Sequence, residues 1–326
     1  MKKILLLYCG YPRISHRYQH DEAVELNKKY KIMIISYNWQ ILTLQDNALP
    51  YIQGNPLKLI NQINNFKPDH IHAHYLCEAN LCNKLSKYYN IPFTIRTHSF
   101  DILETNLTIY KDIINSNNCK GIIAFPGLKK LLVDAGINEN KIICSYPSFA
   151  IYNFKLDLPN DKHIMSGGSL LPKKNIEGYI LLAKKIKKIY PYKEINYYSV
   201  VEDAEYFKKI IKFNTENGNP VIFKTEQYDM PLEYKKHEWL IYTACDKIKK
   251  VGYPLMIAEA QAAGVGVIMY NLRDDLLDYV TENGYLFNTD EEVIKILETP
   301  FCENKKNNLY TILDRYDINN SLSIFN

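Results

Sequence analysis

One segment of the chain combines residue types that could bind an anionic or hydroxylated ligand. In residues 251–268, Gly252 and Pro254 form a turn that opens a short apolar helix, and Pro254 suits its first turn. Gly264 suits the left-handed backbone position after the helix end. Glu259 is the single acid in that helix, and a carboxylate among apolar side chains is costly unless hydrogen bonds reach it. The sequence therefore predicts a polar partner for Glu259.

The beginning of the same helix predicts an anion site. The first N–H groups of a helix have no partner within the helix, and the helix dipole favours negative charge there. In this chain those groups lie from Tyr253 through Leu255 to Met256, with Pro254 between them. We expect this stretch of backbone to bind a phosphate or a similar anion.

A glycine pair and a lysine form a second candidate anion site. Gly167 and Gly168 follow an apolar run that is typical of a strand, and Ser169 and Lys174 come before a helical pattern. Glycine lets a backbone approach a ligand closely. A lysine beside a helix N-terminus can neutralise phosphate. A surface turn that carries lysines is the alternative interpretation.

His98 follows an apolar run at 93–96 that predicts a strand, and Asp101 lies three residues further on. Ligand sites in open α/β sheets lie beyond the carboxyl ends of the strands. This position favours a role for His98 in a binding or catalytic site. We expect His98 and Asp101 to be the catalytic residues. A purely structural histidine is the alternative.

Three histidines alternate along another predicted strand. His70, His72 and His74 share one face of that strand, which invites a metal site. No cysteine or suitably spaced acid completes a recognised metal motif, so we expect no metal. We expect His72 and His74 to line a cleft. Gly10 and Arg13, in the loop after the first strand, are further candidates for acceptor or cleft contacts.

The elements that must position these residues alternate between strands and helices. Strand candidates in the first half are 4–8, 32–36, 70–73, 93–96, 121–124 and 141–145, with helical patterns at 16–28, 78–89 and 128–135. In the second half the strand candidates are 163–166, 195–200, 221–224, 240–243 and 265–270, with a helix predicted over 176–189. This alternation predicts doubly wound parallel sheets of the α/β class. Residues 146–162 suit a linker, and residues 308–317 look helical.

Length and composition limit the class of protein. A chain of 326 residues with 47% hydrophobic residues suits two globular domains, and its net charge of +4 does not by itself indicate nucleic-acid binding. No apolar run reaches the roughly 18 residues of a membrane span. The first nine residues suit a buried strand better than a signal peptide. Seven scattered cysteines without CxxC spacing indicate buried thiols in a reducing cytoplasm.

The segment 251–268 resembles the donor-site signature of GT-B glycosyltransferases, in particular the retaining GT4 family. The signature is usually Glu-Gly-x-Pro, four residues, then Glu-Ala-x-Ala-x-Gly. The matching residues are Gly252, Pro254, Glu259, Ala260, Ala262 and Gly264. Val251 replaces the first glutamate, which touches the donor sugar in that family. Residues 69–74 and 97–101 are also similar to family segments.

The resemblance implies roles for the candidate residues. Lys174 matches a family lysine that binds the donor diphosphate, whereas Ser169 stands where the family has an arginine. The candidates to compensate are Lys173, Lys247, Lys250 and Arg273. Glu259 would accept hydrogen bonds from the ribose hydroxyls of the nucleotide. His98 would lie near the transferred sugar.

The resemblance also implies a GT-B architecture, in which two Rossmann-like domains face each other across a cleft. We expect an acceptor-side domain at 1–152, joined by a C-terminal helix at 308–326, and a nucleotide-sugar domain at 153–307. The implied activity is metal-independent transfer of a sugar, with retention, from a nucleotide sugar to a glycan or lipid-linked acceptor in polysaccharide or glycoconjugate synthesis. UDP is the commonest donor nucleotide of the family. No other cofactor is expected.

Three other functions stay open at this stage. They are a non-catalytic carbohydrate- or nucleotide-binding relative, a nucleotide-sugar epimerase and a nucleic-acid-binding protein. The mild charge and the absence of a recognised module argue against the last. The basic helix face at 183–189 suits a solvated surface, and peripheral contact of a cytoplasmic protein with an anionic membrane is the alternative.

Overall fold

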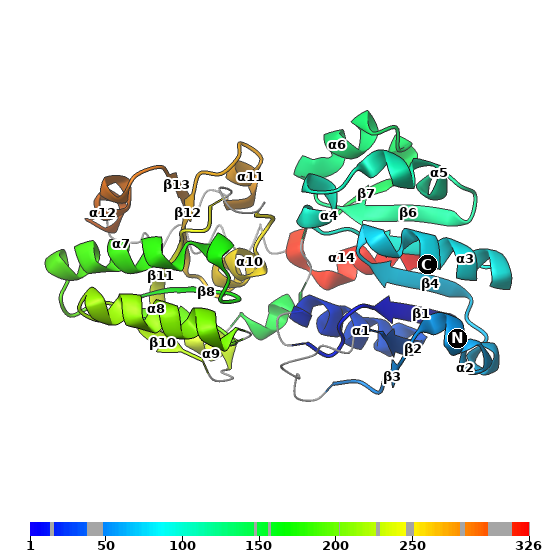
Figure 1. Cartoon of the computed structure of the whole chain (residues 1–326), viewed down its shortest axis with the longest axis horizontal. Helices are drawn as coiled ribbons and strands as arrows, with labels where there is room; N and C mark the ends of the chain where they lie inside the picture. The colour runs from blue at the N-terminus through cyan, green and yellow to red at the C-terminus, as the bar shows by residue number, and fades with distance from the viewer. Residues whose placement is uncertain are drawn as a thin grey trace. The chain divides into compact units, whose positions relative to one another are not determined.

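The chain folds into two compact α/β units, which are shown in Figure 1. One unit comprises residues 1–149 and 315–326, and the other comprises residues 150–314. The structure is a computed structural model. It describes residues 1–13, 16–37, 48–146, 149–155, 158–201, 203–225, 229–245, 251–280, 284–298 and 315–325.

The first unit is built on a parallel sheet of seven strands in the order β3-β2-β1-β4-β5-β6-β7. The strands are β1 (Lys3–Tyr8), β2 (Lys31–Ser36), β3 (Ile52–Gln53), β4 (His70–His74), β5 (Phe93–Arg96), β6 (Cys119–Ala124) and β7 (Ile142–Cys144). Residues 4–7 of β1 are wholly buried, as expected for a central parallel strand that is covered on both faces.

The helices of the first unit connect these strands. They are α1 (Arg17–Lys29), α2 (Ile60–Phe66), α3 (Ala79–Tyr89), α4 (Ser99–Leu103), α5 (Lys111–Ile114), α6 (Lys129–Asp134) and α14 (Ile318–Leu322). The C-terminal α14 packs beside α1, and the buried Leu322 and Phe325 join the core formed by β1 and α1 (Figure 1). Most of the helix expected at 308–317 lies outside the described residues.

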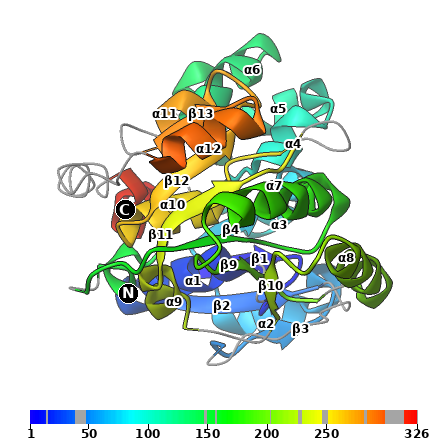
Figure 2. The ribbon, with the colours of Figure 1, turned by 90° about the vertical axis from the view of Figure 1, so that its left-hand side faces the viewer.

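The second unit has a parallel sheet of six strands in the order β10-β9-β8-β11-β12-β13. The strands are β8 (His163–Gly167), β9 (Ile195–Tyr198), β10 (Ile222–Lys224), β11 (His237–Tyr242), β12 (Gly266–Tyr270) and β13 (Gly284–Phe287). The helices are α7 (Ile176–Ile189), α8 (Ala204–Glu216), α9 (Met230–Lys235), α10 (Leu255–Ala262), α11 (Leu276–Val280) and α12 (Asp290–Glu298). Figure 2 shows α7 and α8 side by side.

The strand order of each sheet reverses at one point, between β1 and β4 in the first unit and between β8 and β11 in the second. Ligands of open α/β sheets bind beyond the carboxyl ends of the strands at such a point. Gly10 and His74 therefore belong to the switch point of the first sheet, and Gly168 to that of the second. The predicted doubly wound parallel architecture is confirmed in both units.

The segment 251–268 folds largely as predicted. The helix α10 starts at Leu255, and Gly264 adopts a left-handed φ of 76° directly after the helix, where other residues would be strained. Pro254 stands at the N-cap with extended backbone (φ −69°, ψ 123°), so it precedes the first turn instead of forming part of it.

Candidate functional site

Glu22, on α1, is the centre of a buried polar cluster in the first unit. Its side chain is 1% exposed. One carboxylate oxygen, Oε2, accepts a hydrogen bond of 2.8 Å from Arg96 Nε, and the other, Oε1, contacts His74 Nε2 at 2.8 Å. His72 Nε2 lies 3.0 Å from Oε1 without the geometry of a hydrogen bond. The charge of Glu22 is thus balanced by Arg96 at the carboxyl end of β5.

The same cluster reaches His98, the histidine predicted from the strand end. His74 Nδ1 and His98 Nε2 are 3.1 Å apart. Oδ2 of Asp101 accepts the backbone N–H of His98 at 2.9 Å and that of Leu76 at 3.1 Å. Asp101 therefore ties the start of α4 to the end of β4, and its carboxylate contacts backbone here. The structure brings His72, His74, His98 and Asp101 together, as the strand-end argument requires.

Aromatic rings surround His98. Tyr75 lies 4.4 Å and Tyr18 4.8 Å from it between ring centroids, and the Tyr18 and Tyr75 hydroxyls are hydrogen bonded to each other. Phe100 packs on Tyr75 and is 42% exposed. Phe100 thus extends this cluster of rings to the surface of the unit.

The loop after β1 lies near the same rings. A Cβ added to Gly10 would meet the His16 ring at 3.5 Å, and the ring of His16 is 6.0 Å from that of Tyr75. Burial, together with the nearby charge of Arg13, lowers the pKa of His16 to about 4. Gly10 and Arg13 thus lie close to the cluster.

The ionisation of the cluster follows from its burial. Burial alone would raise the pKa of Glu22, but the charge of Arg96 and the adjacent histidines hold it well below its usual range. Burial lowers the pKa of His74 to about 4 and that of His98 well below its usual value. Near neutral pH the cluster therefore holds a charged Glu22–Arg96 pair and two neutral imidazoles.

Glu22, His72 and His74 also form a group of metal-ligand type, with nitrogen and oxygen atoms within 4.8 Å of one another. Each member of this group already has a contact within the unit. Arg96 already neutralises the carboxylate, and a second cation beside it would be repelled. His72 Nδ1 is hydrogen bonded to Thr94 Oγ1 at 2.8 Å.

In the second unit, Lys174 lies against the glycine loop that follows β8. Gly168 has a φ of 117°, and a Cβ built there would lie 3.4 Å from Lys174 Cε. Lys174 Nζ donates a 2.5 Å hydrogen bond to the Tyr242 hydroxyl, at the carboxyl end of β11. Burial lowers the pKa of Lys174 to about 8. Ser169 follows in the same loop and is partly buried.

The glycine loop and α10 are in contact. A Cβ at Gly167 would lie 2.5 Å from the Tyr198 carbonyl oxygen and 3.1 Å from Met256 Cε, so this position requires glycine. Met256 is in the first turn of α10, whose N-cap makes no side-chain hydrogen bond. The fold therefore places the two predicted anion sites beside each other, at the switch point of the second sheet.

Glu259 has the polar partner that its setting predicts. The Tyr234 hydroxyl donates to Glu259 Oε2 at 2.9 Å and lies 3.3 Å from the Met256 carbonyl oxygen. Tyr234 is fully buried on α9, so it holds the carboxylate in one orientation. No sequence signal pointed to Tyr234, which is 25 residues away from Glu259.

The turn before α10 is held by a separate network. Arg273 Nε donates to Asp275 Oδ1 at 2.9 Å, and its Nη1 donates to the Val251 carbonyl oxygen. The Tyr253 hydroxyl donates to Asp275, and Tyr279 donates to the Pro254 carbonyl oxygen at 2.6 Å. Arg273 thus supports the backbone next to Gly252. Lys247 and Lys250 lie outside the described residues.

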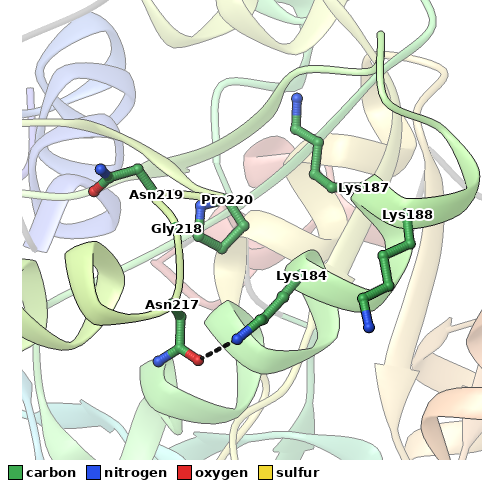
Figure 3. Close-up of a pocket in the computed structure, with 7 residues that line it drawn as sticks. All are labelled: Lys184, Lys187, Lys188, Asn217, Gly218, Asn219 and Pro220. Atoms are coloured by element: carbon green, nitrogen blue, oxygen red, sulfur yellow. Dashed lines mark hydrogen bonds between the residues drawn. The ribbon is translucent and has the colours of Figure 1, made fainter.

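A basic hollow lies at the other end of α7 from Lys174. It is lined by Lys184, Lys187, Lys188, Asn217, Gly218, Asn219 and Pro220, as Figure 3 shows. Lys184 Nζ donates to Asn217 Oδ1 at 3.0 Å.

Across the described ranges, every helix is too short or too polar to cross a bilayer.

The comparison with solved structures identifies the architecture. HepE from Anabaena, solved with UDP, superposes with a TM-score of 0.76 and 18% identity, covering 99% of this chain and 97% of that one. The chain has the GT-B fold.

Two further GT-B structures are similar. A glycosyltransferase from Rickettsia africae has a TM-score of 0.72 and 14% identity, with 98% of this chain and 95% of that one covered. Sucrose-phosphate synthase from Thermosynechococcus elongatus has a TM-score of 0.70 and 16% identity, with 97% and 95% covered. No protein-family model matches the chain, and no curated protein matches it in sequence. The predicted GT-B fold is confirmed.

Sequence reasoning missed Glu22 and Tyr234 in these two sites. Glu22 is one of several acids on α1, and nothing in its sequence neighbours separates it from Asp21 or Glu25. Its distinguishing feature is its pairing with Arg96, which is 74 residues away. Only a sequence signal that links distant positions could have found it.

Proposed function

We propose that this protein is a glycosyltransferase that moves a sugar from a nucleotide-sugar donor, a UDP-sugar, to a glycan or lipid-linked acceptor. The observation that carries the proposal is the contact between the Lys174 glycine loop and the start of α10 at the switch point of the second sheet. The GT-B fold, shared with HepE, which was solved with UDP, supports this choice of donor.

The donor site would work by electrostatics. The Lys174 ammonium, the Ser169 hydroxyl and the backbone near Gly252, Tyr253 and Leu255 would bind the diphosphate. Fixed positive potential there stabilises the negative charge that grows on the departing nucleotide, so the reaction needs no metal. Tyr234 holds Glu259 in one orientation. In that orientation the carboxylate would accept hydrogen bonds from the ribose hydroxyls.

The first unit would serve the sugar and the acceptor. His98 is the residue that we place nearest the reacting sugar, with Tyr75 and Phe100 as its apolar surroundings. Asp101 holds His98 in place through the backbone bond of 2.9 Å, so we assign it a positioning role. We propose transfer with retention, as in the family that the donor segment resembles.

A binding experiment tests the donor site. UDP and UDP-glucose are titrated calorimetrically into the wild type and into the variants Lys174→Ala and Glu259→Ala. Each variant is expected to bind about tenfold or more weakly, since a hydrogen bond to a charged group contributes about 1.5–3 kcal/mol. Lys208→Ala, which changes an exposed lysine of α8, is the control and should bind like the wild type. Unchanged affinity in both site variants would refute this donor site.

A product assay distinguishes a glycosyltransferase from an epimerase and from a non-catalytic relative. A panel of nucleotide sugars is incubated with the protein, with and without glycan acceptors, and the products are identified by mass spectrometry and NMR. Transfer to an acceptor supports the proposal. A changed sugar in the absence of an acceptor would indicate an epimerase, and binding without turnover would indicate a non-catalytic relative.

We further propose that a lipid-linked acceptor is met at an anionic membrane through the basic face of α7. Lys184, Lys187 and Lys188 lie on this face, and the exposed apolar Leu181 and Ile189 flank them. Such a face suits weak peripheral attraction to anionic lipid. The triple lysine-to-alanine variant should lose co-sedimentation with phosphatidylglycerol vesicles. Equal sedimentation of both proteins would contradict this contact.

A further inference from the structure

A line of contacts runs from Glu22 through His74 to His98 in the first unit. Glu22 Oε1 lies 2.8 Å from His74 Nε2, and His74 Nδ1 lies 3.1 Å from His98 Nε2. At the other side of the carboxylate, Arg96 Nε donates to Oε2 at 2.8 Å. Glu22, His74 and Arg96 are all buried, so water does not compete for these bonds.

The position of each proton follows from the chemistry of the groups. An ionised carboxylate only accepts hydrogen bonds, and a neutral imidazole has one donor nitrogen and one acceptor nitrogen. His74 must therefore carry its proton on Nε2, toward Glu22. Its Nδ1 is then an acceptor, so His98 must donate from Nε2. The remaining nitrogen of His98, Nδ1, is left without a proton.

The charge state of the line supports this assignment. Arg96 keeps Glu22 ionised, and burial keeps the pKa of His74 at about 4. Burial also holds the pKa of His98 well below its usual value. Both imidazoles are therefore neutral near pH 7, and each has a single proton to place.

We propose that Glu22 is a positioning residue that acts through His74 to fix His98 as the Nε2–H tautomer. The consequence for the reaction rests on the glycosyl transfer proposed above. His98 then offers only an acceptor, at Nδ1, which also faces the backbone N–H of Asp101 in the capping box of α4, so any further group that meets this atom must donate a hydrogen bond. A hydroxyl of the substrate fits this requirement, whereas a carboxylate or phosphate oxygen does not.

The structure also predicts a substitution that reverses the proton positions on His74 and His98. In Glu22→Gln, the donor Arg96 Nε selects the amide oxygen, because it can only donate to an acceptor. The amide NH₂ then faces His74 Nε2 and forces that nitrogen to accept. His74 carries its proton on Nδ1 and donates to His98, and His98 must move its proton to Nδ1. One substitution of nearly equal shape thus reverses every proton in the line.

The test is a tautomer measurement by NMR, which needs no substrate. The full chain is labelled with ¹⁵N-histidine and studied near pH 7 in EDTA, so that no metal contributes to the ring signals. Long-range ¹H–¹⁵N spectra distinguish the protonated from the unprotonated ring nitrogen, and His98→Gln identifies the His98 signals by their loss. Glu25→Gln is the matched control, because Glu25 is a buried acid of the same helix that pairs with Lys28 at 2.6 Å.

We expect His98 to be the Nε2–H tautomer in the wild type and in Glu25→Gln, and to become the Nδ1–H tautomer in Glu22→Gln. A wild-type His98 protonated on Nδ1 overturns the proposal, even if Glu22→Gln does not fold. A folded Glu22→Gln in which His98 is unchanged also overturns it. His74→Phe breaks the line and should give a mixture of His98 tautomers. Because UDP titration is a separate measurement, failure of the donor site leaves this result interpretable.

Discussion

Tyr75 packs its ring on His98, with 4.4 Å between the ring centroids, from a backbone with φ 79° and ψ 138°. Residues with a Cβ rarely adopt such a backbone, and it costs of order 1–3 kcal/mol. The Tyr75 ring is 6% exposed, so its burial holds this conformation at the carboxyl end of β4. An unfavourable backbone beside the proposed sugar site is the kind of feature that positions a functional side chain.

A pair of variants tests this backbone. Tyr75→Gly and Tyr75→Ala both remove the ring, and both should lower the free energy of unfolding by about 3 kcal/mol or more. Glycine tolerates the positive φ, so Tyr75→Gly should be the more stable of the two by about 1 kcal/mol, the reverse of the usual order. Urea denaturation measures the difference. Equal stability, or a more stable alanine variant, would show that Tyr75 does not hold a positive φ.

Asp101 should make the stability depend on pH. Burial raises the pKa of Asp101 from 3.8 to about 7 in the folded protein. The folded state therefore binds this proton more tightly than the unfolded state does, and the contribution of Asp101 to stability falls as the pH rises from about 4 to about 7. Both backbone N–H bonds end on Oδ2, so the other oxygen can carry the proton.

Asp101→Asn should abolish this dependence, since an amide keeps an acceptor oxygen and has no proton to lose. The free energy of unfolding of the variant, relative to the wild type, should rise steadily between about pH 4 and pH 7 in urea titrations. Asp134→Asn changes an exposed acid that pairs with Lys130, and it serves as the control. A constant difference between Asp101→Asn and the wild type would mean that Asp101 titrates normally.

The affinity for UDP should depend on the charge of Lys174. Because burial lowers its pKa to about 8, the free protein loses this charge as the pH rises above about 8. UDP affinity should therefore fall as the pH rises through about 8, where half of the free protein has lost this charge. Lys174→Arg keeps its charge, since arginine does not deprotonate in proteins, so its affinity should stay flat to about pH 9. Calorimetry measures both profiles, with Lys208→Arg as the control. Parallel profiles of the wild type and Lys174→Arg would show that Lys174 does not bind the diphosphate.

The sequence predicted the elements whose signal is local. The strand at 93–96 and the helix at 176–189 were predicted with their observed bounds, because a continuous apolar run and a clear helical period mark them. The polar partner of Glu259 was also predicted, since an acid in an apolar helix demands one. In contrast, β3 has two residues and leaves too short a pattern to recognise.

The polar contacts inside the sites could not be predicted, for a physical reason. Glu22 is buried by the packing of α1 on the sheet, and its contacts are with Arg96 on β5 and His74 on β4. Tyr234 reaches Glu259 from α9, across the fold. Such contacts depend on tertiary packing. The residue types and their spacing along the chain therefore do not predict them.

Two glycines with positive φ provide a matched test of the donor loop. Gly168 has a φ of 117° and lies beside Lys174, whereas Gly218 has a φ of 87° and open space where a Cβ would lie. Alanine is strained at both positions, so each variant should lose about 1 kcal/mol of stability. Only Gly168→Ala should also bind UDP more weakly, because relief of the strain moves the backbone that approaches the diphosphate.

Calorimetric titration of UDP into Gly168→Ala, Gly218→Ala and the wild type separates the two effects. Equal loss of stability with a selective loss of affinity in Gly168→Ala locates the diphosphate at the loop after β8. Wild-type affinity in both variants would contradict that location. Weaker binding in Gly218→Ala alone would instead place UDP in the lysine-lined hollow beside α7, since Gly218 lines it. The stability measurements ensure that any change in affinity is judged on folded protein.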